Sequence, residues 1–252
     1  ISNSPFVMSE LLPLFPLPNV VLFPNVFLPL HIFEPRYREM TADAVAGDRL
    51  IGMVLLRPGW EVEREQPPSP LRGSGAPGRS SESEGRPPIY SIGCSGLITH
   101  VEALADGRYN IVLRGLERVR ILQEDHTRSY RQAVVESLHE APLQTDDRAV
   151  IRRYRERLEA MLAAAGGPTV RQGSPSTPAV SKGSRAADPK IPAAMGDEDL
   201  VNALAQYLDL EPVEKQALLE RHSLRARAAS LVELLEMKMI IARSPGLSKG
   251  AH

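Results

Sequence analysis

The feature that most constrains this sequence is an apolar stretch, residues 11–40, that is interrupted repeatedly by proline. It reads LLPLFPLPNVVLFPNVFLPLHIFEPRYREM, with prolines at positions 13, 16, 18, 24, 29 and 35. A proline inside a helix removes one backbone hydrogen bond and clashes with the preceding turn. In a bilayer the freed carbonyl groups would also find no water to pair with. We therefore expect short strands that proline begins or ends, and neither a soluble helix nor a membrane span.

Turn signals divide the first part of this stretch. Residues 20–23 (VVLF) and 26–28 (VFL) are short apolar runs, and Pro24-Asn25 between them is a typical turn pair. The pattern predicts two short buried strands joined by a turn.

The next segment changes from strand to helix and back. Pro35 follows Glu34, and proline is favoured at the first position of a helix. Gly47 is placed to end that helix. The run LIGMVLL at residues 50–56 is apolar throughout, which predicts a central strand.

Strand patterns resume after a polar interruption. We expect strands over residues 89–104, 109–121 and 130–138, with bends or bulges at Gly93 and Gly96. Asp106-Gly107 between the first two is a hairpin signal. The last hundred residues show helical spacing instead, with helices expected to begin at Thr145, Asp197, Pro212 and Ser223.

Residues 67–88 and 168–195 differ in composition from the rest, because proline, glycine and serine replace large apolar residues there.

In the rest of the chain the predicted strands come first and the predicted helices second, which indicates the α+β class. The expected organisation is an N-terminal arm (1–10), a β domain (11–142) with a flexible insertion (67–88), a helical subdomain (145–243) with a flexible linker (168–195), and a tail (244–252).

Composition excludes several kinds of site. Cys94 is the single cysteine, so a disulfide within the chain and a zinc site of several thiolates are both excluded. The histidines show no metal-ligand spacing and there is no phosphate-binding GxxxxGK[ST] loop, so no metal and no cofactor is expected. The net charge of −1 gives no overall attraction for nucleic acid. With no signal peptide or membrane span apparent, a cytoplasmic location is expected.

Three segments together carry a family resemblance. They are the opening run with GDRLIGMVLL after it, IGCSGLITHVEALADGRYNIVLRGLERVRI, and the helical tail from residue 197. Their ordered series resembles the LON substrate-binding domain, which forms the N-terminal domain of Lon proteases and also occurs in cereblon and in stand-alone bacterial proteins. The resemblance implies a PUA-like β pseudo-barrel followed by a C-terminal helical bundle. It also implies a stand-alone domain without the ATPase and Ser-Lys protease domains, and hence no enzyme.

The resemblance implies a non-catalytic module that binds polypeptide or a protein partner, with an ATP-dependent protease or chaperone as a candidate partner. Our candidate site residues lie near the proline-rich strands: Phe23, Phe27, Phe33, Arg36 and Tyr37. The alternative interpretation of the phenylalanines is simple core packing. The alternative function is RNA binding, since PUA-like folds include RNA binders, through an arginine stripe formed by Arg114, Arg118 and Arg120. The alternative interpretation of that stripe is the polar outer face of a half-buried sheet.

Overall fold

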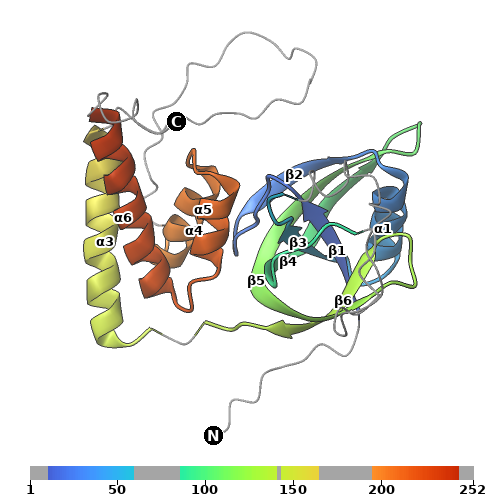
Figure 1. The fold of residues 1–252 in the computed structure, drawn as a ribbon, viewed down its shortest axis with the longest axis horizontal. Helices are drawn as coiled ribbons and strands as arrows, with labels where there is room; N and C mark the ends of the chain where they lie inside the picture. Colours follow the sequence, from blue (N-terminus) through green and yellow to red (C-terminus); the bar gives the residue numbers. More distant parts are fainter. Residues whose placement is uncertain (1–10, 60–85, 141–142, 165–194, 244–252) are drawn as a thin grey trace, which may run out of the picture.

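The computed structural model describes residues 11–59, 86–140, 143–164 and 195–243. The predicted arm and tail lie outside these ranges, as do most of the predicted insertion 67–88 and linker 168–195. Strands precede the helical layer in the described residues, so the α+β class is confirmed (Figure 1).

Six strands form one sheet that closes on itself (Figure 1). They are β1 (Leu12–Leu17), β2 (Phe27–Ile32), β3 (Leu50–Leu55), β4 (Ile92–Ala103), β5 (Tyr109–Asp125) and β6 (Arg131–Ser137). Their order is β2-β5-β4-β3-β1-β6, and β5 also pairs with β6. The β1–β3 pair is parallel and the other pairs are antiparallel. With 17 residues, β5 is long enough to pair with β2, β4 and β6, and this closes the barrel.

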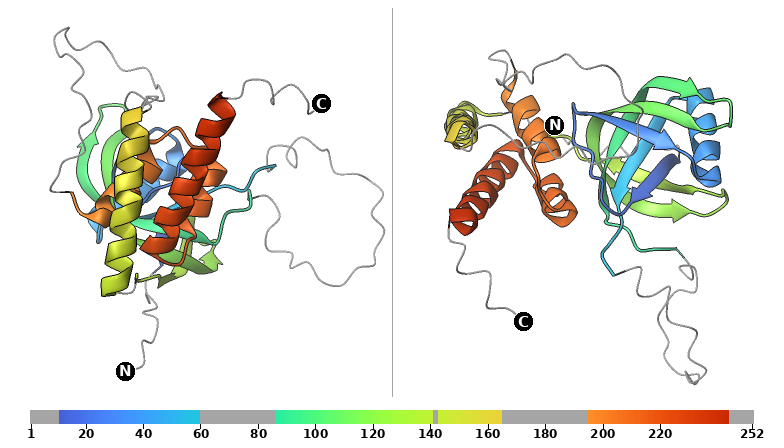
Figure 2. Two further views of the ribbon diagram at one scale, coloured as in Figure 1. Left: turned by 90° about the vertical axis from the view of Figure 1, so that its left-hand side faces the viewer. Right: turned by 90° about the horizontal axis from the view of Figure 1, so that it is seen from above.

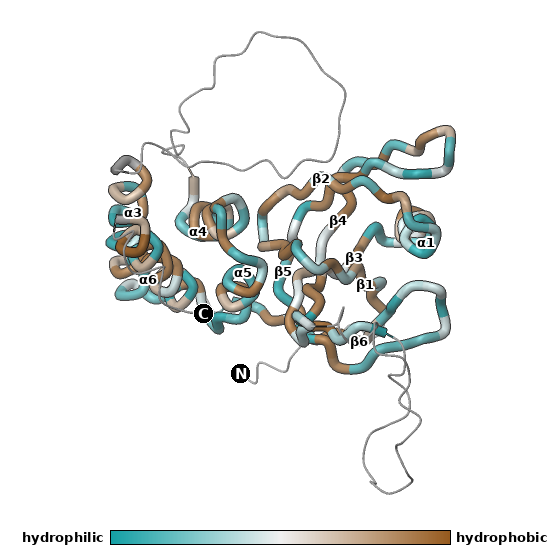
Figure 3. Tube along the Cα trace, turned by 45° about the horizontal axis from the view of Figure 1, so that its top comes forward, coloured by the Kyte–Doolittle hydropathy of each residue, from teal (hydrophilic) through white to brown (hydrophobic). Residues whose placement is uncertain are grey.

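The helices occupy two sides of the barrel (Figures 1 and 2). Helix α1 (Pro35–Ala46) packs on one side through Tyr37, Met40 and Ala44, which are buried. The other four lie on the opposite side: α3 (Thr145–Ala164), α4 (Asp197–Tyr207), α5 (Pro212–Leu219) and α6 (Leu224–Arg243). Helices α4 and α5 lie between the barrel and the α3–α6 pair. In Figure 3 apolar residues follow β1, β2 and β3, whereas polar and apolar positions alternate along the helices.

The prolines of the opening stretch lie where their missing N–H groups cost little. In β1 the register with β6 covers Leu12–Leu14, and the register with β3 covers Leu14–Leu17. Pro13 and Pro16 therefore each have a partner strand on only one side. Strand β2 pairs only with β5, and the Phe27 carbonyl on its other edge accepts a hydrogen bond from the Tyr207 hydroxyl at 3.0 Å. The strands of this stretch are short, as predicted, but Pro13, Pro16 and Pro29 lie inside β1 and β2 rather than at their ends.

The two short strands expected around Pro24 were placed wrongly. Residues 20–23 form no strand, and β2 runs over Phe27–Ile32 rather than 26–28. Residues 21–23 are nevertheless buried: Val21 and Phe23 pack against the helical layer, and Leu22 packs in the core of the barrel. The Phe23 N–H donates to the Gln206 side-chain oxygen at 3.2 Å, so a helix satisfies the backbone where a neighbouring strand was expected.

Most other boundaries agree with the sequence. Helix α1 begins at Pro35 and ends at Gly47, and β3 is a central strand between β1 and β4. The β4–β5 register shifts next to Gly96, as a bulge does. Gly107 turns the hairpin with φ +79°, although the loop covers residues 104–108 rather than two residues. Thr145 was expected to cap a helix and is instead the first residue of α3.

Two buried arginines connect the barrel to the helical layer. Arg118 on β5 is 4% exposed, and its Nη1 donates to the Arg221 carbonyl at 2.6 Å, just after α5. Arg227 on α6 is fully buried and donates to Asn202 Oδ1 at 3.0 Å. Both guanidinium groups pair with the Glu140 carboxylate, at 3.4 Å for Arg118. The two buried arginines and Glu140, which is 19% exposed, form what we call the buried ionic cluster between barrel and helices.

Replacing Arg227 should therefore destabilise the fold strongly. Arg227→Ala leaves Glu140 and Asn202 with fewer partners in a buried site, which costs about 3–5 kcal/mol in the free energy of unfolding. Urea unfolding followed by far-UV circular dichroism measures this. The control is Arg225→Ala on the same helix, whose half-exposed pair with Asp147 is worth about 0–1 kcal/mol. Equal losses of unfolding free energy in the two variants would contradict the assignment of Arg227 to the buried ionic cluster.

Candidate functional site

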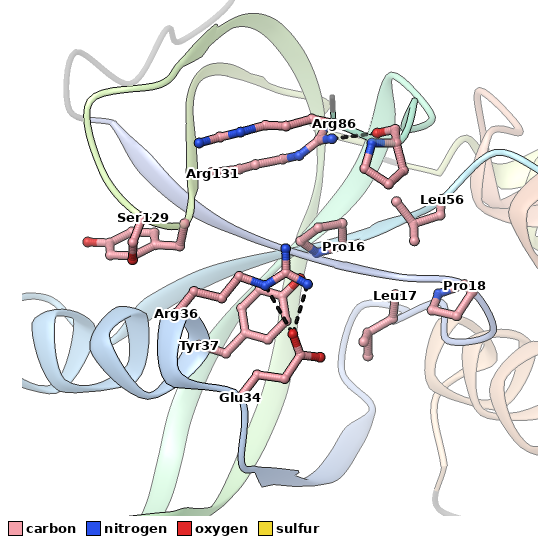
Figure 4. Close-up of a pocket in the computed structure, with 12 residues that line it drawn as sticks. Pro16, Leu17, Pro18, Glu34, Arg36, Tyr37, Leu56, Arg86, Ser129 and Arg131 are labelled. Carbon is pink, nitrogen blue, oxygen red and sulfur yellow. Dashed lines mark hydrogen bonds and ion pairs between the residues drawn. The ribbon is translucent and has the colours of Figure 1, made fainter. Parts of the chain in front are cut away.

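A cavity of about 270 Å³ opens where the end of β1, the start of α1 and the β5–β6 turn meet (Figure 4). Its apolar wall consists of Pro16, Leu17, Pro18, Leu56 and Pro87. Its polar groups are Glu34, Arg36, Tyr37, Arg86, Ser129, Tyr130 and Arg131. The cavity forms because β6 pairs with β1 only as far as Leu14, so the last part of β1 separates from that neighbour.

The start of α1 supplies one side of the cavity. Arg36 Nε and Nη2 donate to the same Glu34 carboxylate oxygen at 3.0 and 2.8 Å. The Arg36 guanidinium also lies 4.5 Å from the centre of the Tyr37 ring, a cation–π contact. Tyr37 in turn packs on Phe15, with ring centroids 4.5 Å apart. Burial raises the pKa of Tyr37, so its phenol stays neutral and can donate or accept a hydrogen bond.

The β5–β6 turn and residues 86–87 supply the opposite side. Arg131 is buried, and its Nη groups donate to Glu124 at 3.1 Å and to the Pro87 carbonyl at 2.5 Å. Burial lowers the pKa of Arg131, and the Glu124 carboxylate opposes that shift. The Tyr130 hydroxyl donates to Asp43 at 2.7 Å, and burial together with this bond raises the pKa of Tyr130 to about 12. Both side chains are thereby held in place around the cavity.

The five predicted site residues lie in three different environments: the cavity, the core and the exposed ends of β2. Arg36 and Tyr37 line the cavity. Phe23 is fully buried between the barrel and the helical layer, where it belongs to the core. Phe27 and Phe33 are 51% and 60% exposed at the two ends of β2, and neither lines the cavity.

Arg86, Arg131 and Tyr130 line the cavity but were not among the predicted residues. One signal in the sequence pointed to Arg131. It is in phase with Ala133 and Val135, the buried positions of β6, so an arginine occupies an inward-facing position of the strand. A charged residue at such a position must be paired, and it marks a polar site inside the fold.

The arginine stripe proposed for RNA does not form a continuous exposed surface. Arg114 and Arg120 are exposed, but Arg118 between them is buried in the ionic cluster. Burial and the neighbouring Arg227 lower the pKa of Arg118. Arg120 is also engaged with Glu136 at 2.6 Å. Arg118 is therefore unavailable for phosphate contacts in this structure.

One serine, histidine and carboxylate lie close together without the geometry of a catalytic triad. Ser137 Oγ lies 3.4 Å from His139 Nδ1, and Glu117 lies 3.0 Å from the same nitrogen. A triad needs the imidazole to bridge serine and carboxylate with its two different nitrogens. Among the described residues, no group of three or more histidine, cysteine, aspartate or glutamate side chains is arranged to hold a metal ion.

Comparison with known proteins places these features in a family. Residues 11–237 match the family model described as the ATP-dependent protease La (LON) substrate-binding domain. This chain belongs to the LON substrate-binding domain family. The match extends over the barrel and most of the helical layer of the LON domain, and it concerns a substrate-binding domain rather than a catalytic one.

Relatives and solved structures agree with this family. The LON domain is 25% identical to a Lon protease of Anaeromyxobacter dehalogenans over 232 residues, and 25% identical to Lon protease 2 of Myxococcus xanthus over 240 residues. These matches cover 92% and 93% of this chain but 24% of each relative, so the chain spans about a quarter of their length.

Two solved structures share the fold at 18% identity. The Lon N-terminal domain protein from Xanthomonas campestris aligns with a TM-score of 0.50, over 89% of this chain and 98% of that one. The N-terminal domain of Mycobacterium avium complex Lon protease aligns with a TM-score of 0.54, over 90% and 98%. No helix in the described part of the LON domain is both long and apolar enough to cross a membrane.

Cys94 should behave as a core residue rather than a nucleophile. Its side chain is fully buried, and burial raises the pKa of the thiol from 9.0 to about 12. At pH 8 the thiolate fraction should be about a thousandfold smaller than at the ordinary pKa. A thiol reagent such as a maleimide should label the native protein far more slowly than the urea-unfolded protein. Equal labelling rates would show an accessible, reactive thiol.

Proposed function

We propose that this LON domain binds unstructured polypeptide in the cavity at the start of α1 and catalyses no reaction itself. The observation that carries the proposal is the lining of the cavity, which combines a wall of proline and leucine with guanidinium and phenol groups. Binding sites typically have mostly apolar walls and a few well-placed polar groups. The volume of about 270 Å³ is just below the range of about 300–1,000 Å³ for drug-sized ligands, which suits one side chain with its flanking backbone.

The polar groups are held in place before any ligand binds. Arg131 is paired with Glu124 of β5, and the Tyr130 hydroxyl donates to Asp43 of α1. Tyr37 packs on Phe15. A site built from fixed side chains loses little conformational entropy when a ligand binds. The family description, a substrate-binding domain of an ATP-dependent protease, supports polypeptide as the ligand class.

The relatives support a proposal for the destination of the bound polypeptide. The matched relatives are Lon proteases of which this chain spans about a quarter. We therefore propose that the domain supplies polypeptides to an ATP-dependent protease or chaperone. A reducing, cytoplasmic location is proposed on the grounds that the single cysteine is a buried free thiol.

Filling the cavity should abolish binding without unfolding the protein. Ser129 is exposed and lines the cavity, so Ser129→Trp places an indole in the space that the polypeptide would occupy. We expect the Kd for unstructured fluorescent peptides, measured by anisotropy, to rise about tenfold or more, which corresponds to about 1.4 kcal/mol.

The matched control is Thr127→Trp, in the same turn but outside the cavity lining. It should bind peptides as the unmodified protein does, and circular dichroism should show both variants folded. Equal binding by the unmodified protein and Ser129→Trp would place the site elsewhere.

A further inference from the structure

The cavity carries an excess of positive charge. Three of its lining residues are arginines, and Glu34 is the single carboxylate among them. Arg36 is paired with Glu34, and Arg131 is paired with Glu124 outside the lining, so the excess comes from Arg86. Arg86 donates to His126 Nδ1 at 3.2 Å and to the Arg128 carbonyl at 3.4 Å. Within the described residues, therefore, Arg86 has no carboxylate within ion-pair distance. An anionic group in the cavity would be attracted by this excess.

Arg36 already holds a carboxylate, and that carboxylate comes from the protein itself. Both Arg36 donors reach one oxygen of Glu34, and both side chains are about half exposed, at 52% and 40%. An exposed pair of this kind is worth about 0–1 kcal/mol, so a competing carboxylate can displace it. Figure 4 shows Arg36 extending from α1 towards the side of the cavity that carries Arg86 and Arg131.

The backbone around the cavity does not offer many alternative donors. Pro16, Pro18 and Pro87 have no N–H groups. Glu34 stands at the N-cap of α1 but its carboxylate makes no capping hydrogen bond, and the first turn of the helix contains no acidic residue. The positive end of the helix dipole thus adds to the guanidinium groups, and the Glu34 carboxylate at the N-cap opposes both.

We propose that the cavity recognises a carboxylate on the bound polypeptide, with Arg36 and Arg86 as its donors and Glu34 as the internal group that it displaces. Guanidinium groups bind carboxylates through two parallel hydrogen bonds, which gives direction as well as strength. The carboxylate belongs either to the C-terminus of the polypeptide or to one of its aspartate or glutamate residues. This inference rests on the proposed polypeptide-binding function and names the chemical group that the site selects.

Three peptides of one unstructured sequence test the inference: one with a free C-terminal carboxylate, one amidated, and one amidated with aspartate as its last residue. The unmodified protein should bind the free-acid peptide about tenfold more tightly than the amidated peptide, as measured by fluorescence anisotropy. The aspartate peptide distinguishes a C-terminal carboxylate from a side-chain carboxylate. It should bind as tightly as the free-acid peptide only if the site accepts the carboxylate of an acidic side chain.

Two variants should move the affinity in opposite directions. Arg36→Gln should remove most of the preference for the free acid, whereas Glu34→Gln should strengthen free-acid binding severalfold and leave the amidated peptide unchanged. Arg120→Gln, which loses an exposed pair with Glu136 outside the cavity, is the control and should bind as the unmodified protein does.

Equal affinity for the free-acid and amidated peptides overturns carboxylate recognition. The proposed function then still holds if Ser129→Trp weakens both peptides alike. If none of the three peptides binds, the proposed function fails as well, and carboxylate recognition fails with it. A weaker free-acid affinity in Glu34→Gln would also overturn the inference, since it would make Glu34 part of the binding site rather than a competitor.

Discussion

The arrangement of the barrel and the helical layer depends on the buried ionic cluster of Arg118, Glu140 and Arg227. Burying an ion is costly unless its charge is paired and its donors are satisfied, so this cluster tolerates few relative positions of its elements. Arg118 comes from β5, Glu140 from the segment after β6, and Arg227 from α6. Two arginines share one carboxylate, and carbonyls after α5 accept hydrogen bonds from Arg118. We interpret the cluster as fixing orientation more than adding stability.

Other contacts at the same interface follow from that orientation. Gln216 on α5 donates to the Ile92 carbonyl of β4 at 2.9 Å, and Tyr207 on α4 reaches the Phe27 carbonyl of β2. Phe23 belongs to the apolar core that the barrel and the helices share. The cavity is lined by the start of α1 and by no residue of α3–α6. Helix α1 lies on the side of the barrel opposite to those helices (Figure 1). The helical layer therefore supports the barrel and leaves the proposed binding site open.

Local rules in the sequence predicted the parts of the fold that depend on backbone chemistry. The prolines of residues 11–35 correctly indicated short strands, and Pro35, Asp197 and Pro212 correctly marked helix starts. The failure at residues 20–23 has a tertiary cause, because a glutamine from α4 supplies the hydrogen bond that a strand neighbour would supply. Nothing in the local pattern of VVLF distinguishes these two partners.

The site was less predictable than the fold for a similar reason. Arg114, Arg118 and Arg120 look alike along the sequence, and only the packed helices bury the middle one. Phe23 and Phe27 are likewise four residues apart, yet one is in the core and the other is half exposed. Arg36 and Tyr37, which were selected for their place near the proline-rich strands, line the cavity. Arg86 lies about 50 residues from Arg36 in the sequence, yet both line the cavity. No local sequence pattern indicates that these two residues share a site.

Binding of polypeptide in the cavity at the start of α1 is tested most directly by NMR on the ¹⁵N-labelled protein. Backbone amide shifts would be followed while an unstructured peptide with a free C-terminus is added. We predict that the largest changes map to residues 34, 36, 37 and 129–131, all of which line the cavity, and that β2 and α6 change little. Changes concentrated on Phe27 and Phe33, or on the helical layer, would contradict this location of the site.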